Sequence, residues 1–237
     1  MRETAMFPLS SVLMPYMPLP LRIFESRYLV MLGNLLDEED PHFGVVLIER
    51  GPEAGGGEQR FSTGTLARVS RVAAREEDLQ LVAIGGGRFE VEEWLDDAPY
   101  PRAIVRELPM PEWNDGLTPL RDRAERTVRR LLSVAAEFAE LSWDADIELA
   151  DDPAHACWQL AGIAPLGTLD HLALLRCSSL AQLLTDLIAR CEDAEPLLTA
   201  PAPDRAFQSE LEDLLDDGDA GGESPPKPPS GPGDGSA

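Results

Sequence analysis

The spacing of apolar residues changes once along the chain, close to Pro109. Up to about Glu107, short apolar runs are separated by glycine, proline and charged clusters, which is typical of a small closed or half-closed β structure. Beyond that point, apolar residues recur every three or four positions, as they do on one face of a helix. Strands followed by helices predict an α+β fold.

The expected strands all lie in the first part of the chain. Phe43–Glu49 is apolar up to its last residue and should be buried on both faces. The glycines at 85–87 stand between two strand-like runs, so we expect a hairpin turn there rather than a phosphate-binding loop. The predicted strands are Phe43–Glu49, Gly64–Val72, Asp78–Ile84, Arg88–Trp94 and Ala103–Glu107.

One helix, Glu25–Leu36, is predicted inside the β region. Its residues Tyr28, Leu29, Leu32 and Leu36 recur at helical spacing, so it should pack across an open side of the sheet. The later helices start at polar residues or prolines that favour a first helical turn, and they should form a small bundle. They are expected to begin at Thr118, Asp152, Thr168 and Ser178.

These patterns divide the chain into three parts. We expect a β-rich subdomain at 1–112 and a helical bundle subdomain at 113–191. Residues 192–237 are acidic and then rich in proline, glycine and serine, a composition that buries too little apolar surface to offset the entropy of ordering. This third part is therefore expected to be a disordered tail.

Composition limits the class of partner. An apolar fraction of 43% provides a core, while the net charge of −23 opposes binding to nucleic acid and to anionic membranes. Prolines interrupt the apolar N-terminus, and no run of about 18 apolar residues occurs. We expect a cytoplasmic protein with neither nucleic-acid nor membrane partners.

Few residues in this sequence are suited to catalysis. The only lysine, Lys227, lies in the expected tail, and no phosphate-binding loop of the G-x-x-x-x-G-K-[ST] type is present. The cysteines fall in predicted helices among leucine and alanine, which favours buried reduced thiols over nucleophiles. We predict no catalytic residue, no metal site and no cofactor from the set His42, His155, His171, Cys157, Cys177 and Cys191.

Several motifs resemble a known family. The first are Met6–Leu9 (MFPL), Met14–Tyr28 (MPYMPLPLRIFESRY) and Phe43–Ile48 (FGVVLI). They are similar to the amino-terminal substrate-binding domain of the Lon protease family, whose members open with FPL, continue through LPL-x-IFE-x-RY and follow with an FGV-type strand. The resemblance covers roughly residues 6–191 and includes Gly64–Thr65, Gly87–Phe89, Pro99–Ala103 and Leu166–Leu175.

The resemblance implies a PUA-like β-barrel with one embedded helix, followed by a helical bundle, and a role in engaging proteins. We interpret its motif residues as structural rather than as ligand contacts. Ile23 and Phe24 should anchor the start of the helix in the core, and Glu25 should pair with Arg27 or Arg22 near the positive end of the helix dipole. Tyr28 is the remaining structural residue of the motif.

Full-length members of that family also carry an ATPase module and a Ser-Lys peptidase module. Neither is recognisable in this sequence, so we expect a stand-alone, non-catalytic member. Our leading hypothesis is a module that binds proteins or unfolded peptide segments, possible roles being an adaptor or a regulator of proteolysis or protein quality control. The alternatives are RNA binding, by analogy with other PUA-like barrels, and a small-molecule sensor.

Apolar groups near the predicted barrel rims would suit unfolded segments, and core packing is the alternative interpretation for them. The candidate peptide-binding surface consists of Met14, Tyr16, Met17, Trp94 and Tyr100.

Overall fold

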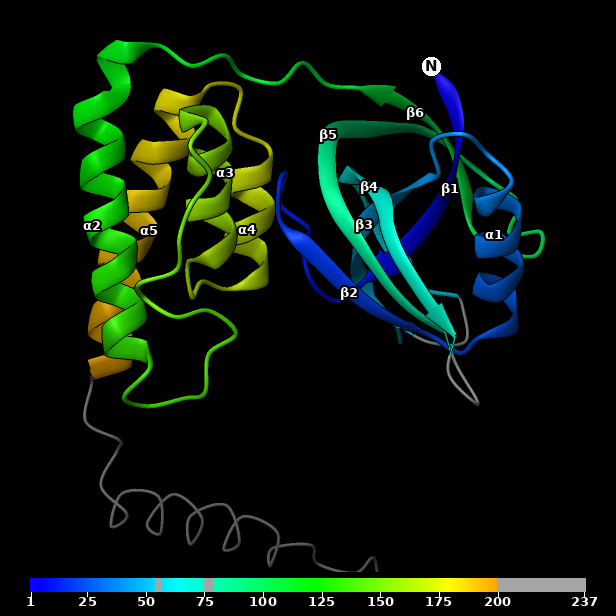
Figure 1. Cartoon of the computed structure of the whole chain (residues 1–237), viewed down its shortest axis with the longest axis horizontal. Helices are drawn as coiled ribbons and strands as arrows, with labels where there is room; N and C mark the ends of the chain where they lie inside the picture. Colours follow the sequence, from blue (N-terminus) through cyan, green and yellow to red (C-terminus); the bar gives the residue numbers. More distant parts are fainter. Residues whose placement is uncertain (54–56, 75–78, 200–237) are drawn as a thin grey trace, which may run out of the picture. The chain divides into compact units, whose positions relative to one another are not determined.

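The computed structural model describes residues 1–53, 57–74 and 79–199 (Figure 1). Met1–Leu198 form one compact unit. Lys227 and most of the expected tail lie outside the described residues. The strands are β1 (Arg2–Leu9), β2 (Pro18–Ile23), β3 (His42–Arg50), β4 (Gln59–Ala74), β5 (Leu79–Leu95) and β6 (Arg102–Glu107); the helices are α1 (Ser26–Leu36), α2 (Thr118–Ala135), α3 (Pro153–Ile163), α4 (Thr168–Leu175) and α5 (Leu180–Thr199), with a short 3-10 helix at Asp115–Leu117.

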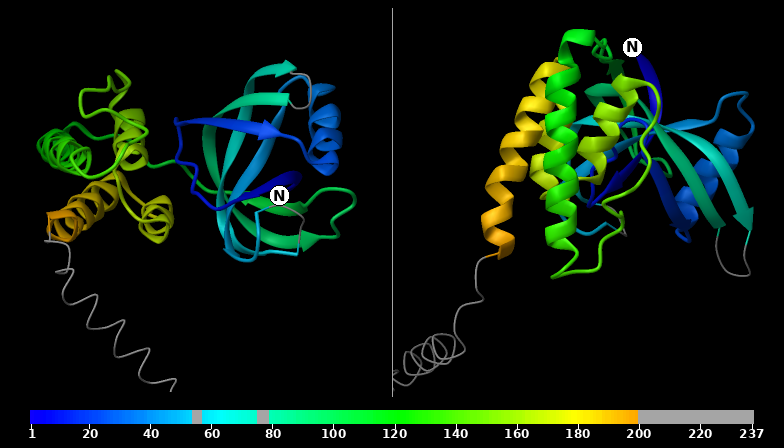
Figure 2. Two further views of the ribbon diagram at one scale, coloured as in Figure 1. Left: turned by 90° about the horizontal axis from the view of Figure 1, so that it is seen from below. Right: turned by 60° about the vertical axis from the view of Figure 1, so that its left-hand side comes forward.

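The strands form one mixed sheet in the order β2-β5-β4-β3-β1-β6, and β6 pairs with β5 as well as with β1. Strands β5, β4, β3, β1 and β6 are therefore hydrogen-bonded in a closed circuit, to which β2 is added beside β5. β1 and β3 run parallel, whereas the other pairs are antiparallel. Helices α2 to α5 gather together, and α1 lies against the strands away from them (Figures 1 and 2).

The hairpin expected at the glycines 85–87 is wrong, because β5 continues through them as one strand. The first half of β5 pairs with β2 and the second half with β6, while β4 accompanies both halves. The glycines thus mark the point where β5 exchanges one neighbour for another. A Cβ atom at Gly85 would lie 2.3 Å from the carbonyl oxygen of Met14, so glycine is needed for the close approach of these two backbones.

The helices of the second half agree well with the predicted ones. The side chain of Asp152 caps α3, since it accepts a hydrogen bond of 2.9 Å from the backbone N–H of His155. α4 begins at Thr168, as predicted. α5 starts at Leu180, with the hydroxyl of Ser179 rather than that of Ser178 accepting from the first turn, and it continues beyond the boundary expected at 191.

α1 forms where expected, but its buried face coincides only in part with the predicted one. Its buried residues are Tyr28, Met31, Leu32 and Leu35. Two positions of the predicted stripe, Tyr28 and Leu32, are therefore correct. The other two, Leu29 and Leu36, are exposed because the buried face is centred about one position away from the one that the spacing suggested.

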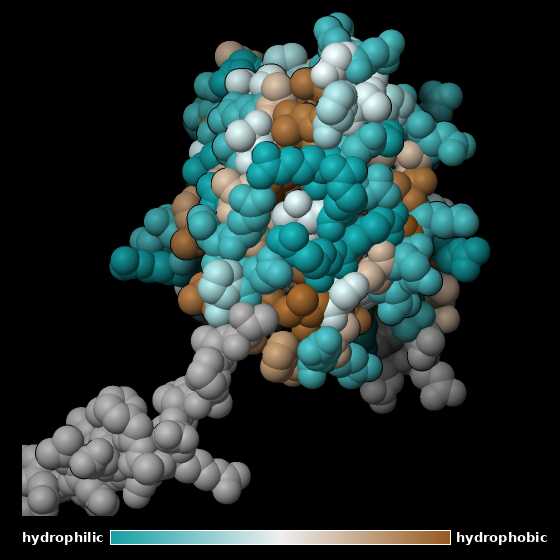
Figure 3. Space-filling view, turned by 90° about the vertical axis from the view of Figure 1, so that its left-hand side faces the viewer, coloured by the Kyte–Doolittle hydropathy of each residue, from teal (hydrophilic) through white to brown (hydrophobic). Residues whose placement is uncertain are grey.

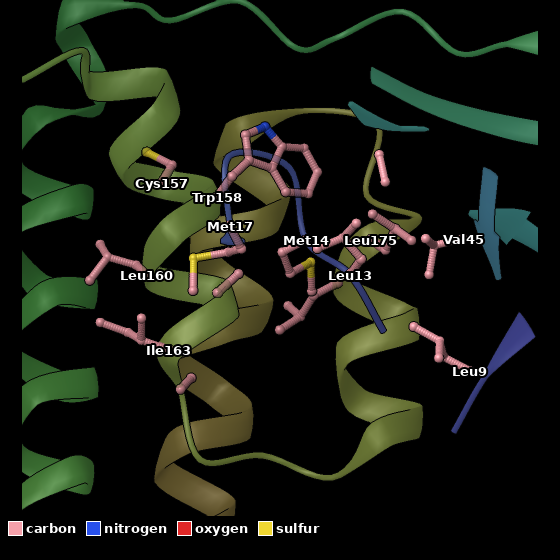
Figure 4. Packing of buried hydrophobic residues seen from close by; sticks show 14 of the residues in the cluster. Leu9, Leu13, Met14, Met17, Val45, Cys157, Trp158, Leu160, Ile163 and Leu175 are labelled. Atoms are coloured by element: carbon pink, nitrogen blue, oxygen red, sulfur yellow. The ribbon is translucent and has the colours of Figure 1, made fainter. Parts of the chain in front are cut away.

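One large buried cluster contains residues of the strands, of α1 and of α2 to α5. The segment 13–17 inserts Leu13, Met14 and Met17 between the strands and the helices (Figure 4). Met17 packs so closely on α3 that a Cβ atom at Gly162 would lie 2.5 Å from its Cγ. A smaller cluster among the strands consists of Met6, Val46, Leu66, Phe89, Ala103 and Val105.

Arg88 on β5 connects the strands to the helices through polar contacts. This residue is 3% exposed, and its guanidinium lies 4.9 Å from the centre of the Trp158 ring on α3. It donates hydrogen bonds to the carbonyl oxygens of Leu175 (2.8 Å), Cys177 (2.7 Å) and Pro109 (2.8 Å). Burial lowers the pKa of Arg88.

Candidate functional site

The family-motif residues lie where β2 ends and α1 begins. Ile23 and Tyr28 are each 2% exposed and belong to the core, as predicted. Nε of Arg27 donates to the carboxylate of Glu25 at 3.2 Å, which is one of the two expected pairings. The prediction for Phe24 is wrong, since this side chain is 60% exposed. It follows the inward-facing last residue of an extended strand, and successive side chains of a strand point to opposite faces.

Phe24 borders an apolar pocket of about 250 Å³. The walls include the buried side chains of Phe7, Leu9 and Ile23, and Phe7 stacks on Tyr28 with the ring centres 4.0 Å apart. The Tyr28 hydroxyl is buried without a hydrogen-bond partner among the described residues, and burial is the main reason that its pKa is raised to about 12. The lining is completed by Leu21, Arg22, Glu25 and Glu53.

The exposed side of α1 carries three large apolar residues. Leu29, Val30 and Leu36 are 37%, 47% and 48% exposed. A Cβ atom at Gly33, between them on the helix, would meet nothing within 4 Å. Together with Phe24 these three residues are half of the large apolar side chains that are exposed in the described part of the chain. We call Phe24, Leu29, Val30 and Leu36 the α1 patch.

Two of the predicted surface residues are core residues instead. Met14 and Met17 are 1% and 7% exposed and pack between the strands and the helices (Figure 4). They are buried because the segment that carries them is hydrogen-bonded to β5: the N–H of Tyr16 donates to the carbonyl oxygen of Gly85, and the N–H of Gly85 to that of Met17. These methionines therefore offer no surface to a peptide.

The other three predicted surface residues are half-buried, and each packs against a different neighbour. Tyr16 has a φ of 63°, in the left-handed region, and its ring stacks at 3.7 Å on a histidine of α3. Trp94 lies below the guanidinium of Arg60 at 4.8 Å. The hydroxyl of Tyr100 accepts a hydrogen bond of 3.1 Å from Asn34 of α1. Tyr16 shares a segment with Met14 and Met17, whereas Trp94 packs against the smaller cluster of the strands, so the five predicted residues do not form one exposed surface.

The described residues contain no group of three or more His, Cys, Asp and Glu side chains that could hold a metal ion. Cys157, Cys177 and Cys191 are free and buried, which confirms the predicted burial. Burial raises their thiol pKa values to about 11, 11 and 12, so they stay protonated and poorly nucleophilic. Burial also lowers the pKa of His171. No helix in these residues is both long and apolar enough to cross a membrane.

The outward side of α2 carries arginines that are mostly paired. Arg123 donates to Glu192 at 2.9 Å and Arg130 to Glu195 at 2.6 Å, both acceptors being on α5. Polar side chains predominate on this side of the molecule, with smaller apolar groups between them (Figure 3). This side is a solvated surface, and exposed ion pairs of this kind contribute little to stability.

Comparison with known families identifies the family to which this chain belongs. A family model described as "ATP-dependent protease La (LON) substrate-binding domain" matches residues 3–190. The chain belongs to this family. The resemblance predicted from the sequence motifs is thereby confirmed. A relative, Lon protease 2 of Hydrogenovibrio crunogenus, is 27% identical over 95 residues, which are 38% of this chain and 11% of that protein. The match thus spans a small part of that relative's length.

Solved structures show the same fold as this LON domain. A Lon N-terminal domain protein from Xanthomonas campestris has a TM-score of 0.57 and 24% identity, covering 80% of this chain and 98% of that one. The N-terminal domain of a Lon protease from the Mycobacterium avium complex has a TM-score of 0.58 and 15% identity, covering 81% and 99%. The shared architecture is a mixed sheet with helices, as the α+β prediction required.

Neither the α1 patch nor the role of Arg88 was predicted from the sequence. The sequence does contain an indication of each. The helix predicted at Glu25–Leu36 holds more apolar residues than one buried stripe needs. Arg88 follows three glycines in a segment that resembles the family, yet nothing local indicates that its partners are carbonyl groups far along the chain.

Proposed function

We propose that this LON domain is a non-enzymatic module that binds protein or unfolded peptide segments, and that it serves as an adaptor or regulator in proteolysis or protein quality control. The α1 patch is the observation that carries the proposal. It is an uncovered apolar surface beside an apolar pocket, in a domain whose family is described by substrate binding. Exposed apolar patches of this kind mark interaction sites in soluble proteins.

The geometry of the patch suits apolar segments of varied sequence. α1 carries apolar residues on its buried face and also on its exposed side, where Ser26 and Asn34 are the exposed polar residues. A helix with one buried stripe needs fewer apolar residues than this. Phe24 supplies a large rigid ring at the mouth of the pocket, and aromatic side chains dominate the energetics of interfaces. A bound segment would cover the ring and the exposed side of α1 together.

Further features support the finer parts of the proposal. The closed circuit of β5, β4, β3, β1 and β6 supports a PUA-like barrel, and the grouping of α2 to α5 supports a helical bundle after it. Free, buried cysteines suit the reducing cytoplasm. The net charge of −23 favours protein partners over nucleic acid and anionic membranes.

The test measures how the full chain affects the aggregation of a chemically unfolded client protein, followed by light scattering. We expect the wild type to slow aggregation. The variant Phe24→Ser/Val30→Ser/Leu36→Ser should lose most of this effect, because all three side chains are exposed and their replacement removes the apolar surface without disturbing the core. Crosslinking to the client should fall in parallel.

A matched control replaces apolar residues elsewhere that are at least as exposed as those of the α1 patch. Phe138 and Leu169 are 62% and 67% exposed, and the variant Phe138→Ser/Leu169→Ser should behave like the wild type. The proposal fails if the wild type does not slow aggregation. It also fails if the α1-patch variant is as effective as this control.

A further inference from the structure

A second pocket, of about 390 Å³, shares no lining residue with the pocket beside Phe24 and is lined by residues from all five strands of the closed circuit. Its volume is in the range of sites for small ligands. Leu66 belongs both to this lining and to the small buried cluster among the strands, so the pocket has an apolar floor. None of its lining residues belongs to the α1 patch.

The register of the strands arranges the polar and apolar groups of this pocket in one row. His42 on β3 pairs with Arg68 on β4, and Arg68 pairs with Ile84 on β5. Directly opposite residues on neighbouring strands place their side chains next to one another on one face. Leu66 stands two positions before Arg68 and faces the same way. We call this site the Arg68 pocket.

Arg68 is the cation available to a ligand in this pocket. It makes no hydrogen bond or ion pair with any residue that the structure describes. Arg2, by contrast, lies 3.6 Å from Glu107, so these two opposite charges in the lining offset each other. The remaining acid of the lining, Asp40, is exposed and screened by water. In a chain with 43 acidic and 20 basic residues, an arginine that has no partner among the described residues is available to an external anion.

His42 presents an acceptor beside this cation. Its Nδ1 lies 2.7 Å from the carbonyl oxygen of Asp40, which can only accept, so Nδ1 carries the proton in that contact. In the neutral ring Nε2 is then an acceptor. The pocket therefore combines a planar donor for an anion, an acceptor for an N–H group and an apolar floor formed by Leu66 and Ile84.

We propose that the Arg68 pocket binds a carboxylate that stands next to an apolar side chain, the chemistry found at the C-terminus of a peptide and in an N-acyl amino acid. Arg68 would receive the carboxylate through two parallel N–H bonds. Leu66 and Ile84 would contact the apolar side chain, and Nε2 of His42 would accept from the adjacent amide N–H. This site is separate from the α1 patch and does not depend on the function proposed for it.

The test uses the full chain and a fluorescent peptide that ends in Ala-Ala-Leu, followed by anisotropy. The free acid should bind at least about tenfold more tightly than the same peptide with an amidated C-terminus, since a charge-assisted hydrogen bond is lost in the amide. Arg68→Gln should weaken binding of the free acid by a similar factor and leave binding of the amide unchanged. N-acetyl-leucine serves as a competitor that distinguishes an N-acyl amino acid from a peptide C-terminus as the ligand. If N-acetyl-leucine binds as tightly as the free-acid peptide, the pocket is assigned to small acids. If it binds more weakly than the peptide, the pocket is assigned to peptide C-termini.

Arg71→Gln is the matched control. Arg71 is exposed on the same strand, makes no hydrogen bond or ion pair with the described residues and does not line the pocket, so this variant should bind like the wild type. The Phe24→Ser/Val30→Ser/Leu36→Ser variant should also retain binding of the free acid. Equal affinity for the acid and the amide would overturn the proposal, as would full affinity in Arg68→Gln.

Discussion

Arg88 illustrates how a buried charge is accommodated without a carboxylate. Two of its three acceptors, the carbonyl oxygens of Leu175 and Cys177, are at and just beyond the end of α4. The last carbonyl groups of a helix have no partner within the helix and carry the negative end of its dipole. The guanidinium of Arg88, on a strand, thus supplies hydrogen-bond donors to the C-terminus of α4. Its two acceptors there lie 87 and 89 positions later in the chain.

Arg88→Met should destabilise the protein by about 3 kcal/mol. Methionine fills the space of the aliphatic part of the Arg88 side chain, but it leaves three carbonyl oxygens without a hydrogen-bond donor. Urea denaturation followed by circular dichroism measures the change. Arg126→Gln is the control, since Arg126 is exposed on α2 without a partner among the described residues, and its effect should stay within about 0.5 kcal/mol. If the urea midpoint of Arg88→Met equals that of the wild type, Arg88 does not stabilise the contact between the strands and the helices.

At the scale of elements, the glycines of β5 carry unequal constraints. A Cβ atom at Gly85 would lie 2.3 Å from a backbone oxygen, which cannot move without displacing the whole segment 13–17. A Cβ atom at Gly87, two positions later in the same strand, would meet nothing within 4 Å. Three consecutive glycines that look alike in the sequence therefore have different structural roles.

We expect Gly85→Ala to lower stability by about 2 kcal/mol or more, the cost of inserting a methyl group into a packed site. Gly87→Ala should be neutral or slightly stabilising, since alanine loses less backbone entropy than glycine in a strand. Thermal unfolding of the two variants side by side gives the comparison. Similar melting temperatures for both would mean that the backbone of Met14 relaxes freely.

The elements that the sequence predicts well are those with local signals. The helix α3 starts at Pro153 after a capping aspartate, and both act within one turn. β1 and β2 carried no such signal, because prolines in them argue against a strand. Pro20 is tolerated since β2 stands at the edge of the sheet order, and Pro8 since the second half of β1 pairs with β3 but not with β6.

The candidate site was not predicted in this place. The IFE-x-RY motif lies at the junction of β2 and α1, beside the pocket, but its residues were interpreted as structural and the peptide-binding surface was expected elsewhere. Whether Phe24 faces inward depends on a change of one position in the turn from strand to helix, and tertiary packing decides that phase. Leu29 and Leu36 are exposed because the buried face of α1 is centred about one position away from the expected one. Three of the four residues of the α1 patch were thus expected in the core.

At the scale of the whole molecule, the strands and the helices share one core. The boundary expected at residue 112 cuts through the large cluster, which includes Leu13, Met14 and Met17 from the first part and α3 residues from the second. Losing the cover over these three side chains costs about 2 kcal/mol each, or about 6 kcal/mol. That sum is comparable to the total stability of an ordinary domain, about 5–15 kcal/mol.

A fragment ending at residue 112 should therefore not fold by itself, whereas Met1–Leu198 should unfold in one cooperative step. Hydrogen exchange read by mass spectrometry tests the second statement, because amides of β4 and of α3 should then exchange through the same global opening with equal free energies. A sharp unfolding transition in the isolated fragment, or clearly lower protection in α3 than in β4, would mean that the two halves are independent. Arg88→Met provides the decisive comparison, because removing that contact should lower the protection of both elements by the same amount if the core is shared.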